Sequence, residues 1–374
     1  MVPSPAFIID REALRRNLTV LEAARAEVGF TLLFALKGFA LPAVMDDILA
    51  VAEGLAASSL NEALLAYEYG RRKVHLYAPA YRPVDVPKLV SLAETWTFNS
   101  LEALARWAPH LPDSIALGLR VNPHYGSAAA DLYNPGRPGT RLGVPPAYAS
   151  LDLPARITGL HVHTLCEADA ESTFRLVEAL IHHFHKWLKK VRWVNLGGGH
   201  LLTRAGYDRH RFAEAITLLR SEFPNLEHIY LEPSAAFVWE AGYLVCEVLD
   251  LTQNDNRHWA MLDVSFTAHM PDTLEMPYKP AIREALPNPD PAYPTYWLGG
   301  ITCLAGDAIG PYSFPRPLEV GDRLTFCDMA HYTFVKTTLF NGVAHPAILV
   351  KEANGYRLVK EFGYADYRHR LTNG

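Results

Sequence analysis

The first 236 residues alternate short apolar runs with segments of helical periodicity, and this alternation constrains the fold more than any other feature of the chain. About eight strand-plus-helix units can be counted, which is what a closed parallel barrel requires. An open, doubly wound sheet is the alternative, but no GxGxxG motif follows the first strand, which counts against a dinucleotide-binding fold. The strand-like runs include 31–37, 74–77, 95–98, 115–121, 157–163, 193–196 and 228–232.

The character of the sequence changes after Pro233. Helix signals become sparse and proline frequent, which is typical of a mostly antiparallel β domain. We therefore predict an α/β protein in which residues 12–236 form a TIM-like (β/α)8 barrel, and residues 1–11 and 237–374 form the β domain. The strand-like runs of this second region lie at 243–250, 259–264, 296–298, 323–326 and 347–350.

Charge and cysteine content narrow the class of protein. The 374 residues carry a formal net charge of -5, which argues against a general nucleic-acid surface. The four cysteines are far apart and form no CxxC pair, which favours a reducing compartment. The N-terminus lacks a signal-peptide pattern, and no apolar run is long enough to span a bilayer. We expect a cytoplasmic enzyme that binds neither nucleic acid nor membrane.

A single lysine ends the apolar run 31–37. Lys37 is followed by Gly38, which allows the backbone to turn. A lysine at the end of a buried strand is poorly solvated, and desolvation lowers its pKa and makes the amine a nucleophile towards carbonyl groups. The functional interpretation is a Schiff-base lysine, and the alternative is a strand-end lysine whose ammonium group reaches water.

The C-terminal ends of the strands carry the active site in a parallel barrel. Three consecutive glycines, 197–199, could cradle a phosphate with their backbone N–H groups, or form only a tight turn. Glu232 lies where a carboxylate could hold a pyridine nitrogen protonated and strengthen a pyridoxal ring as an electron sink, or it is only a strand-end glutamate. His163 could stack on a flat cofactor or be a satisfied histidine. The remaining candidate strand ends are Lys37, Ser58-Ser59 and Arg120.

Three histidines at helical spacing, His182, His183 and His185, raise the question of a metal. No second set of ligands accompanies them, so we interpret them as a solvated helix face. We predict no metal site.

A small-residue loop in the β domain carries a thiol and a carboxylate. Cys303 and Asp307 lie four residues apart in the sequence GGITCLAGD at 299–307. The thiol could protonate a carbanion and the carboxylate could hold an amine, whereas the alternative is a buried structural cysteine. Tyr332, in an aromatic-rich stretch, could donate to a phosphate or simply pack.

Several of these residues belong to motifs that resemble the fold-type III pyridoxal-phosphate decarboxylases. This group includes ornithine and diaminopimelate decarboxylases and shares its barrel with alanine racemase. Within it, AHMPDTLEMPY at 268–278, followed by CLAGD and AHYTFVKTTLFNG, resembles the carboxynorspermidine (carboxyspermidine) decarboxylases. The resemblance covers essentially the whole chain. Its broader motifs are Ala35-Leu36-Lys37, His161–Thr164, Gly197–Gly199, Glu232-Pro233, Thr302–Asp307 and Tyr332 with Phe340–Gly342.

The resemblance implies pyridoxal 5'-phosphate as the cofactor and a homodimer whose active sites are shared between subunits. Cys303 and Asp307 would reach into the site of the partner subunit, and Asp272 would meet an amine of a small cationic polyamine substrate. Cys303 or water would protonate the α-carbon after the carboxylate leaves. The implied cofactor residues are Lys37 for the aldimine, His163 for ring stacking, Glu232 for the pyridine nitrogen, and Gly198, Gly199 and Tyr332 for the phosphate.

One position departs from the family pattern. The Glu-Pro pair is followed by Ser234-Ala235-Ala236, where the family reads Gly-Glu-Ala, so the carboxylate that the family would use near the substrate is missing at Ala235. Losing one charged partner of a desolvated amine costs roughly 1.5–3 kcal/mol. Either another group compensates, or the preferred substrate differs.

The resemblance implies decarboxylation of carboxynorspermidine or carboxyspermidine to norspermidine or spermidine in polyamine biosynthesis. A related decarboxylase of another carboxylated polyamine or of a basic amino acid is the alternative. Diaminopimelate enzymes typically read Glu-Pro-Gly-Arg, and no arginine lies at 234–236. Non-catalytic cofactor carriers keep the barrel and lysine but are short and lack the β domain. A catalytically weakened regulatory paralogue of full length remains open because of Ser234-Ala235.

Overall fold

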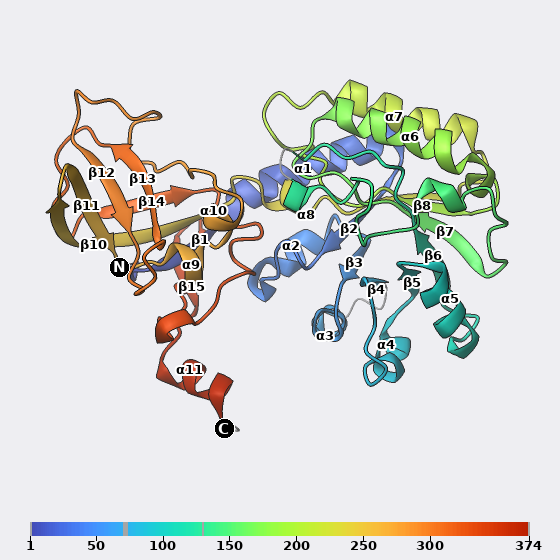
Figure 1. The fold of residues 1–374 in the computed structure, drawn as a ribbon, viewed down its shortest axis with the longest axis horizontal. Coiled ribbons are helices and arrows are strands. Elements are labelled where there is room, and N and C mark those ends of the chain that lie inside the picture. Colours follow the sequence, from blue (N-terminus) through green and yellow to red (C-terminus); the bar gives the residue numbers. More distant parts are fainter. Residues whose placement is uncertain (1, 70–73, 129–130, 373–374) are drawn as a thin grey trace. The chain divides into compact units, whose positions relative to one another are not determined.

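The chain forms two compact units in the computed structural model, which describes residues 2–69, 74–128 and 131–372 (Figure 1). One unit comprises residues 17–237, and the other comprises residues 1–16 together with 238–374. The first helix, α1 (Arg11–Val28), crosses the boundary between them. Among the described residues, no helix combines the length and apolar character needed to cross a membrane.

The unit of residues 17–237 is a closed parallel barrel, which confirms the predicted fold class. Each strand pairs in parallel with the next, and β2 pairs with β9 to close the ring through Thr31 with Tyr230 and Leu32 with Leu231. The strands are β2 (Thr31–Ala35), β3 (Gly54–Ala57), β4 (Val74–Tyr77), β5 (Thr95–Phe98), β6 (Ala116–Arg120), β7 (Ile157–His161), β8 (Trp193–Asn195) and β9 (His228–Leu231).

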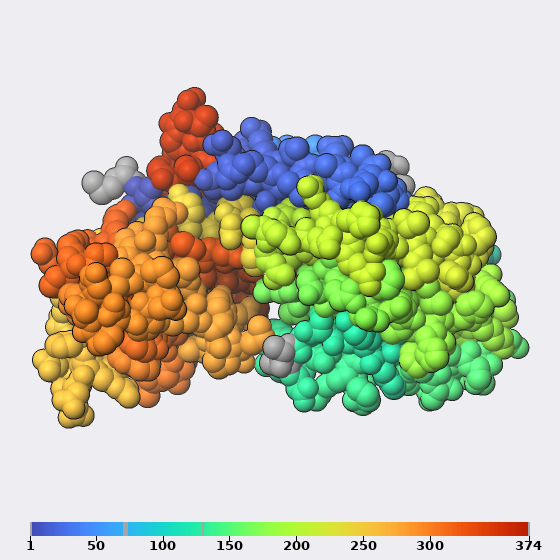
Figure 2. Space-filling view, turned by 90° about the horizontal axis from the view of Figure 1, so that it is seen from above, coloured from blue at the N-terminus to red at the C-terminus, as the bar shows by residue number. Residues whose placement is uncertain are grey.

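Several helices that follow the barrel strands begin at a capping side chain. Side chains of Ser59, Ser100, Asp169 and Asp208 each accept a backbone N–H from the first turn of the next helix. Helices α6 and α7 lie side by side (Figure 1), and their outer surface is exposed in Figure 2. The helices of this unit after α1 are α2 (Met45–Leu49), α3 (Leu60–Glu68), α4 (Val86–Leu92), α5 (Leu101–Trp107), α6 (Ala170–Leu188), α7 (Arg209–Glu222) and α8 (Ser234–Val238). The described loops of this unit also contain the 3-10 helices η1 (Pro42–Val44), η2 (Ala108–His110), η3 (Asp131–Tyr133) and η4 (Pro146–Tyr148).

Large side chains fill the barrel beside small ones. Trp193 of β8 lies against Gly159 on the adjacent strand β7 and Gly118 on the next strand, β6, where an added Cβ would overlap the indole ring. The indole Nε1 donates to Thr158 Oγ1 at 3.1 Å. The barrel is therefore a packed core, and chemistry is confined to the ends of its strands.

The other unit is a mostly antiparallel sheet, as the sequence predicts. Its strand order is β13-β12-β11-β10-β1-β15-β16, with β14 paired to β10, and only the β1–β15 and β11–β12 pairs are parallel among the described strands. Phe266, Phe314 and Phe326 are buried in its core. The strands are β1 (Ala6–Asp10), β10 (Gly242–Asn254), β11 (Arg257–Leu262), β12 (Thr295–Gly299), β13 (Ala308–Ser313), β14 (Arg323–Cys327), β15 (Ala347–Glu352) and β16 (Gly355–Lys360). Its short helices are α9 (Phe266–His269), α10 (Asp272–Glu275), η5 (Phe340–Gly342) and α11 (Tyr364–Leu371).

Candidate active site

Lys37 lies two residues beyond the end of β2, at the C-terminal mouth of the barrel. Burial of its ammonium group is the main cause of a lowered pKa, and the guanidinium of Arg120 lowers the pKa further, whereas Glu232 and Glu62 oppose the shift. This environment favours the neutral, nucleophilic amine. The geometry therefore supports the Schiff-base interpretation over a lysine that reaches water.

Ser234 is hydrogen-bonded to the last residue of β2, Ala35, two residues before this lysine. Its buried hydroxyl accepts the Ala35 N–H and donates to the Ala35 carbonyl, each at 2.8 Å. Gly38 packs so closely on the Ser234 side chain that an added Cβ would lie 2.8 Å from the serine Cβ. In the sequence Ser234 stands out only as a departure from the family pattern, because its partner Ala35 lies 199 positions away.

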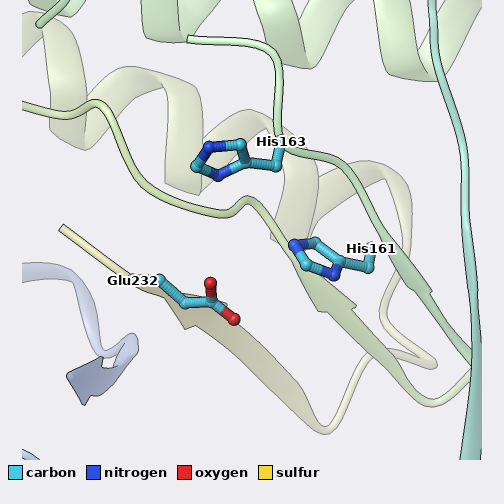
Figure 3. A group of neighbouring side chains, drawn as sticks. All are labelled: His161, His163 and Glu232. Atoms are coloured by element: carbon cyan, nitrogen blue, oxygen red, sulfur yellow. The ribbon is translucent and has the colours of Figure 1, made fainter. Parts of the chain in front are cut away.

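Glu232, His161 and His163 gather at the ends of β7 and β9 (Figure 3). Their candidate ligand atoms all lie within 4.8 Å of one another. Asn195 at the end of β8 donates to Glu232 Oε1 at 2.7 Å and accepts the Gly197 N–H at 2.8 Å. Asn195 thus fixes the carboxylate to the glycine turn, a role that sequence analysis missed although Asn195 directly precedes Leu196 and the glycines.

The ring of His163 is fixed by the same glycine turn. The Gly198 N–H donates to His163 Nδ1 at 2.8 Å, so the neutral ring carries its proton on Nε2. Burial, followed by the charges of Lys37 and Arg120, holds the pKa of His163 well below its usual range. An added Cβ at Gly197, where φ is +69°, would lie 2.5 Å from His163 Nδ1, so the turn needs glycine there.

The two glycines predicted to hold a phosphate lie in different environments. The N–H of Gly198 is already directed at His163, so a phosphate would compete with that bond. Gly199 has φ of +92°, and an added Cβ would overlap the carbonyl oxygen of Leu165. The close approach of the Leu165 backbone therefore requires glycine at position 199, and the phosphate assignment stays a prediction.

A hydrogen-bond network extends from the buried Arg120 at the barrel mouth to the loop around Arg141. Arg120 donates to Tyr77 Oη at 2.6 Å and to the His163 carbonyl at 2.7 Å. Tyr77 donates to Asn99 Oδ1 at 2.8 Å, and Asn99 Nδ2 donates to the Arg141 carbonyl at 2.8 Å. Tyr77 ends β4, so its position carried a signal that sequence analysis did not use.

The remaining predicted residues lie in the sheet unit. Cys303 is exposed, and its N–H donates to Asn341 Oδ1 at 3.0 Å. Asp307 is buried, and its carboxylate accepts four hydrogen bonds from its own unit. Asp272 forms an ion pair with Lys336, which also contacts Glu275 Oε2 at 2.5 Å. Tyr332 lies in the turn after β14, with φ of +55°.

Comparisons with known proteins define the class. A family model described as "Pyridoxal-dependent decarboxylase, C-terminal sheet domain" matches residues 7–330, and the chain belongs to this family. It is therefore a pyridoxal-dependent decarboxylase, as the sequence motifs predicted. A diaminopimelate decarboxylase structure shares the fold with a TM-score of 0.84 at 18% identity, covering 99% of this chain and 94% of that one.

More similar relatives narrow the comparison to enzymes named for carboxylated polyamines. The chain is 46% identical to "Carboxyaminopropylagmatine decarboxylase" from Synechocystis sp., over 99% of this chain and 96% of the relative. It is 36% identical to "Carboxynorspermidine/carboxyspermidine decarboxylase" from Campylobacter jejuni, over 99% and 98%. The crystal structure of carboxynorspermidine decarboxylase with norspermidine from Campylobacter jejuni has a TM-score of 0.89 at 33% identity, covering 99% of this chain and all of that one.

The residues at the barrel mouth fit the cofactor of this family. They provide a buried amine with a lowered pKa, a hydrogen-bonded carboxylate and a glycine turn that side chains could not replace. His161 Nε2 is buried and has no hydrogen-bond partner among the described residues, as expected of a group that faces a ligand. We interpret His161, His163 and Glu232 as part of this cofactor site rather than as ligands of a metal.

Proposed function

We propose that this enzyme decarboxylates a carboxylated polyamine, with pyridoxal phosphate held at the barrel mouth by Lys37. The observation that best supports this proposal is a lysine of lowered pKa beside the Asn195–Glu232 pair and the His163 ring. The named activities of the relatives at 35–46% identity support this class of substrate.

The chain's own residues then have distinct tasks. Pyridoxal phosphate, when bound, supplies a sink for the electrons that remain when carbon dioxide leaves. Glu232, oriented by Asn195, would hold the ring nitrogen in its protonated state, and His163 would support the ring face. The neutral amine of Lys37 would attach the cofactor and later release the product. Orientation and fixed charge are therefore the protein's contribution.

Cys303 is the proposed proton donor to the α-carbon, acting in the site of a partner subunit. Its loop exposes two apolar side chains, Ile301 and Leu304, each 46% exposed, and Phe340, which precedes the Asn341 that bonds to Cys303, is 43% exposed. Exposed apolar residues around a reactive thiol fit a surface that a second copy of the chain covers. We therefore propose a homodimer. A cytoplasmic location also stays a prediction, supported by four free cysteines.

Two substrates are candidates, and the alanine at position 235 bears on the choice between them. Carboxynorspermidine or carboxyspermidine is the predicted substrate. Carboxyaminopropylagmatine is favoured by the 46% identity to the Synechocystis enzyme, and its guanidinium group differs from an ammonium in size and hydrogen-bonding geometry. Ala235 is buried at the start of α8, so this position offers a methyl group instead of a carboxylate.

The test is an absorption spectrum of the purified protein followed by carbon dioxide release with carboxynorspermidine, carboxyspermidine and carboxyaminopropylagmatine. A cofactor band with release from any of the three supports the proposed class, and the ratios of kcat/KM rank the substrates. A cofactor band with no carbon dioxide release from any of the three compounds refutes the proposed substrates and favours a regulatory paralogue. The absence of a band after cofactor is added refutes the site at Lys37.

A further inference from the structure

We propose that Asp307 is a positioning residue that holds the loop 300–307 and thereby places Cys303, rather than a ligand of the substrate amine. This inference rests on the proposed function, in which Cys303 delivers a proton. It concerns only the sheet unit, where every contact that carries it lies.

The carboxylate of Asp307 is fully engaged inside its own unit. One oxygen accepts the N–H groups of Phe266 and Thr267 at 2.6 and 3.1 Å. The other accepts the N–H and the hydroxyl of Thr302 at 3.2 and 2.6 Å. The residue is 3% exposed. A carboxylate offers about four acceptor sites, so these bonds leave little capacity for an additional amine.

The backbone of the loop is built around this carboxylate. The Gly300 N–H donates to the Asp307 carbonyl at 2.7 Å, and the Asp307 N–H donates to the Leu304 carbonyl at 2.9 Å. An added Cβ at Gly300 would overlap both carboxylate oxygens. Glycine at position 300 is therefore required for Asp307 to close the loop, and Cys303 lies within the closed segment.

Two distant motifs meet at this loop. Asp307 ties it to the start of α9, which opens the segment that leads to Asp272. Asn341 holds the loop from the other side through the Cys303 N–H, and its φ of +58° suits asparagine or glycine. The thiol-bearing loop is thus hydrogen-bonded both to the two residues that precede AHMPDTLEMPY and to the Asn341 near the end of AHYTFVKTTLFNG.

If Asp307 positions Cys303, loosening the loop should misdirect the proton that Cys303 delivers. If the thiol is misplaced after carbon dioxide leaves, the proton goes to a carbon of the cofactor instead of the substrate α-carbon. The amino group then stays on the cofactor, and water supplies the oxygen of an aldehyde product in place of the amine. A loosened loop should therefore raise the aldehyde share and lower kcat, with little change in KM.

Asp307→Asn, Thr302→Val and Asn341→Gly test this in the holoenzyme, with Thr252→Val on the exposed face of β10 as the control. We expect Asp307→Asn to lower kcat by about tenfold or more, since it removes charge-assisted hydrogen bonds, and to raise the aldehyde share in the same direction as Cys303→Ala. Thr302→Val and Asn341→Gly should show the same pattern more weakly. Amide hydrogen exchange of residues 300–307 should accelerate in all three variants and not in Thr252→Val.

Two outcomes overturn the inference. The first is that Asp307→Asn raises KM tenfold or more and leaves the aldehyde share unchanged, while Thr302→Val changes neither kcat nor the aldehyde share. This result would make Asp307 a substrate ligand. Unchanged exchange of residues 300–307 in Asp307→Asn would show that the carboxylate does not hold the loop. Normal turnover and product in Cys303→Ala would instead refute the proposed proton donor, and the exchange measurement would still decide the role of Asp307.

Discussion

Replacing Ser234 by alanine tests how the end of β2 is held ahead of Lys37. The hydroxyl is the acceptor for the Ala35 N–H and a donor to the Ala35 carbonyl, both at 2.8 Å in a buried setting. The carbonyl keeps a second donor, the Gly38 N–H at 3.2 Å, after the substitution. The loss is therefore mainly one orphaned buried amide, which costs about 1–3 kcal/mol.

The assay is amide hydrogen exchange of the β2 region in the native protein. Opening at Ala35 should become roughly 5- to 150-fold more frequent, which is the same free energy expressed as an equilibrium constant. Ser221→Ala is the matched control, because its exposed hydroxyl donates only to the Leu218 carbonyl within α7. Equal exchange at Ala35 in Ser234→Ala and the unmodified protein would refute the reasoning.

Three further predictions concern the cofactor, the substrate and pH. Lys37→Ala should abolish the aldimine absorption near the visible edge, whereas the exposed Lys88→Ala should keep it; a band that survives in Lys37→Ala removes the lysine from its role. Ala235→Glu should raise carboxynorspermidine turnover by about tenfold if the missing carboxylate matters, and no gain would mean that the site already compensates. His200 is fully buried and burial lowers its pKa to about 4 from the ordinary 6.5, so the unfolded chain binds the extra proton first and stability falls as pH drops from 6.5 towards 4. His200→Gln should remove up to about 3 kcal/mol of that pH dependence in denaturant unfolding, and an unaltered pH dependence would contradict the assignment.

The fold class could be predicted from the sequence because the strands of both sheets follow local patterns of apolar residues. Alternating apolar runs and helix caps such as Ser59 and Ser100 depend on neighbouring residues, so the barrel and its strand ends could be predicted. Lys37, His163 and Glu232 were found for the same reason, since a strand end in a parallel barrel is a strong positional signal.

The contacts that orient these residues could not be predicted in the same way. Ser234 reaches Ala35 across 199 positions, and no local periodicity records such a pair. Asp307 was interpreted from its residue type as an amine ligand, whereas its four hydrogen bonds depend on how loop 300–307 folds against α9. Residue type indicates which chemistry a side chain can do, but the number of bonds it already makes decides whether it is available.

The position of β1 has a consequence for synthesis on the ribosome. This strand leaves the exit tunnel before the other described strands, yet it pairs with β10 and, through Ala6 with Ala347, with β15. Translation proceeds at roughly 5–20 residues per second, so the N-terminal strand waits on the order of tens of seconds for its parallel partner. The barrel strands, which end at Leu231, emerge well before that. During synthesis the nascent chain therefore exposes an apolar strand whose partners have not yet been made, and chaperone binding to this strand would protect the chain from misplaced strand pairing.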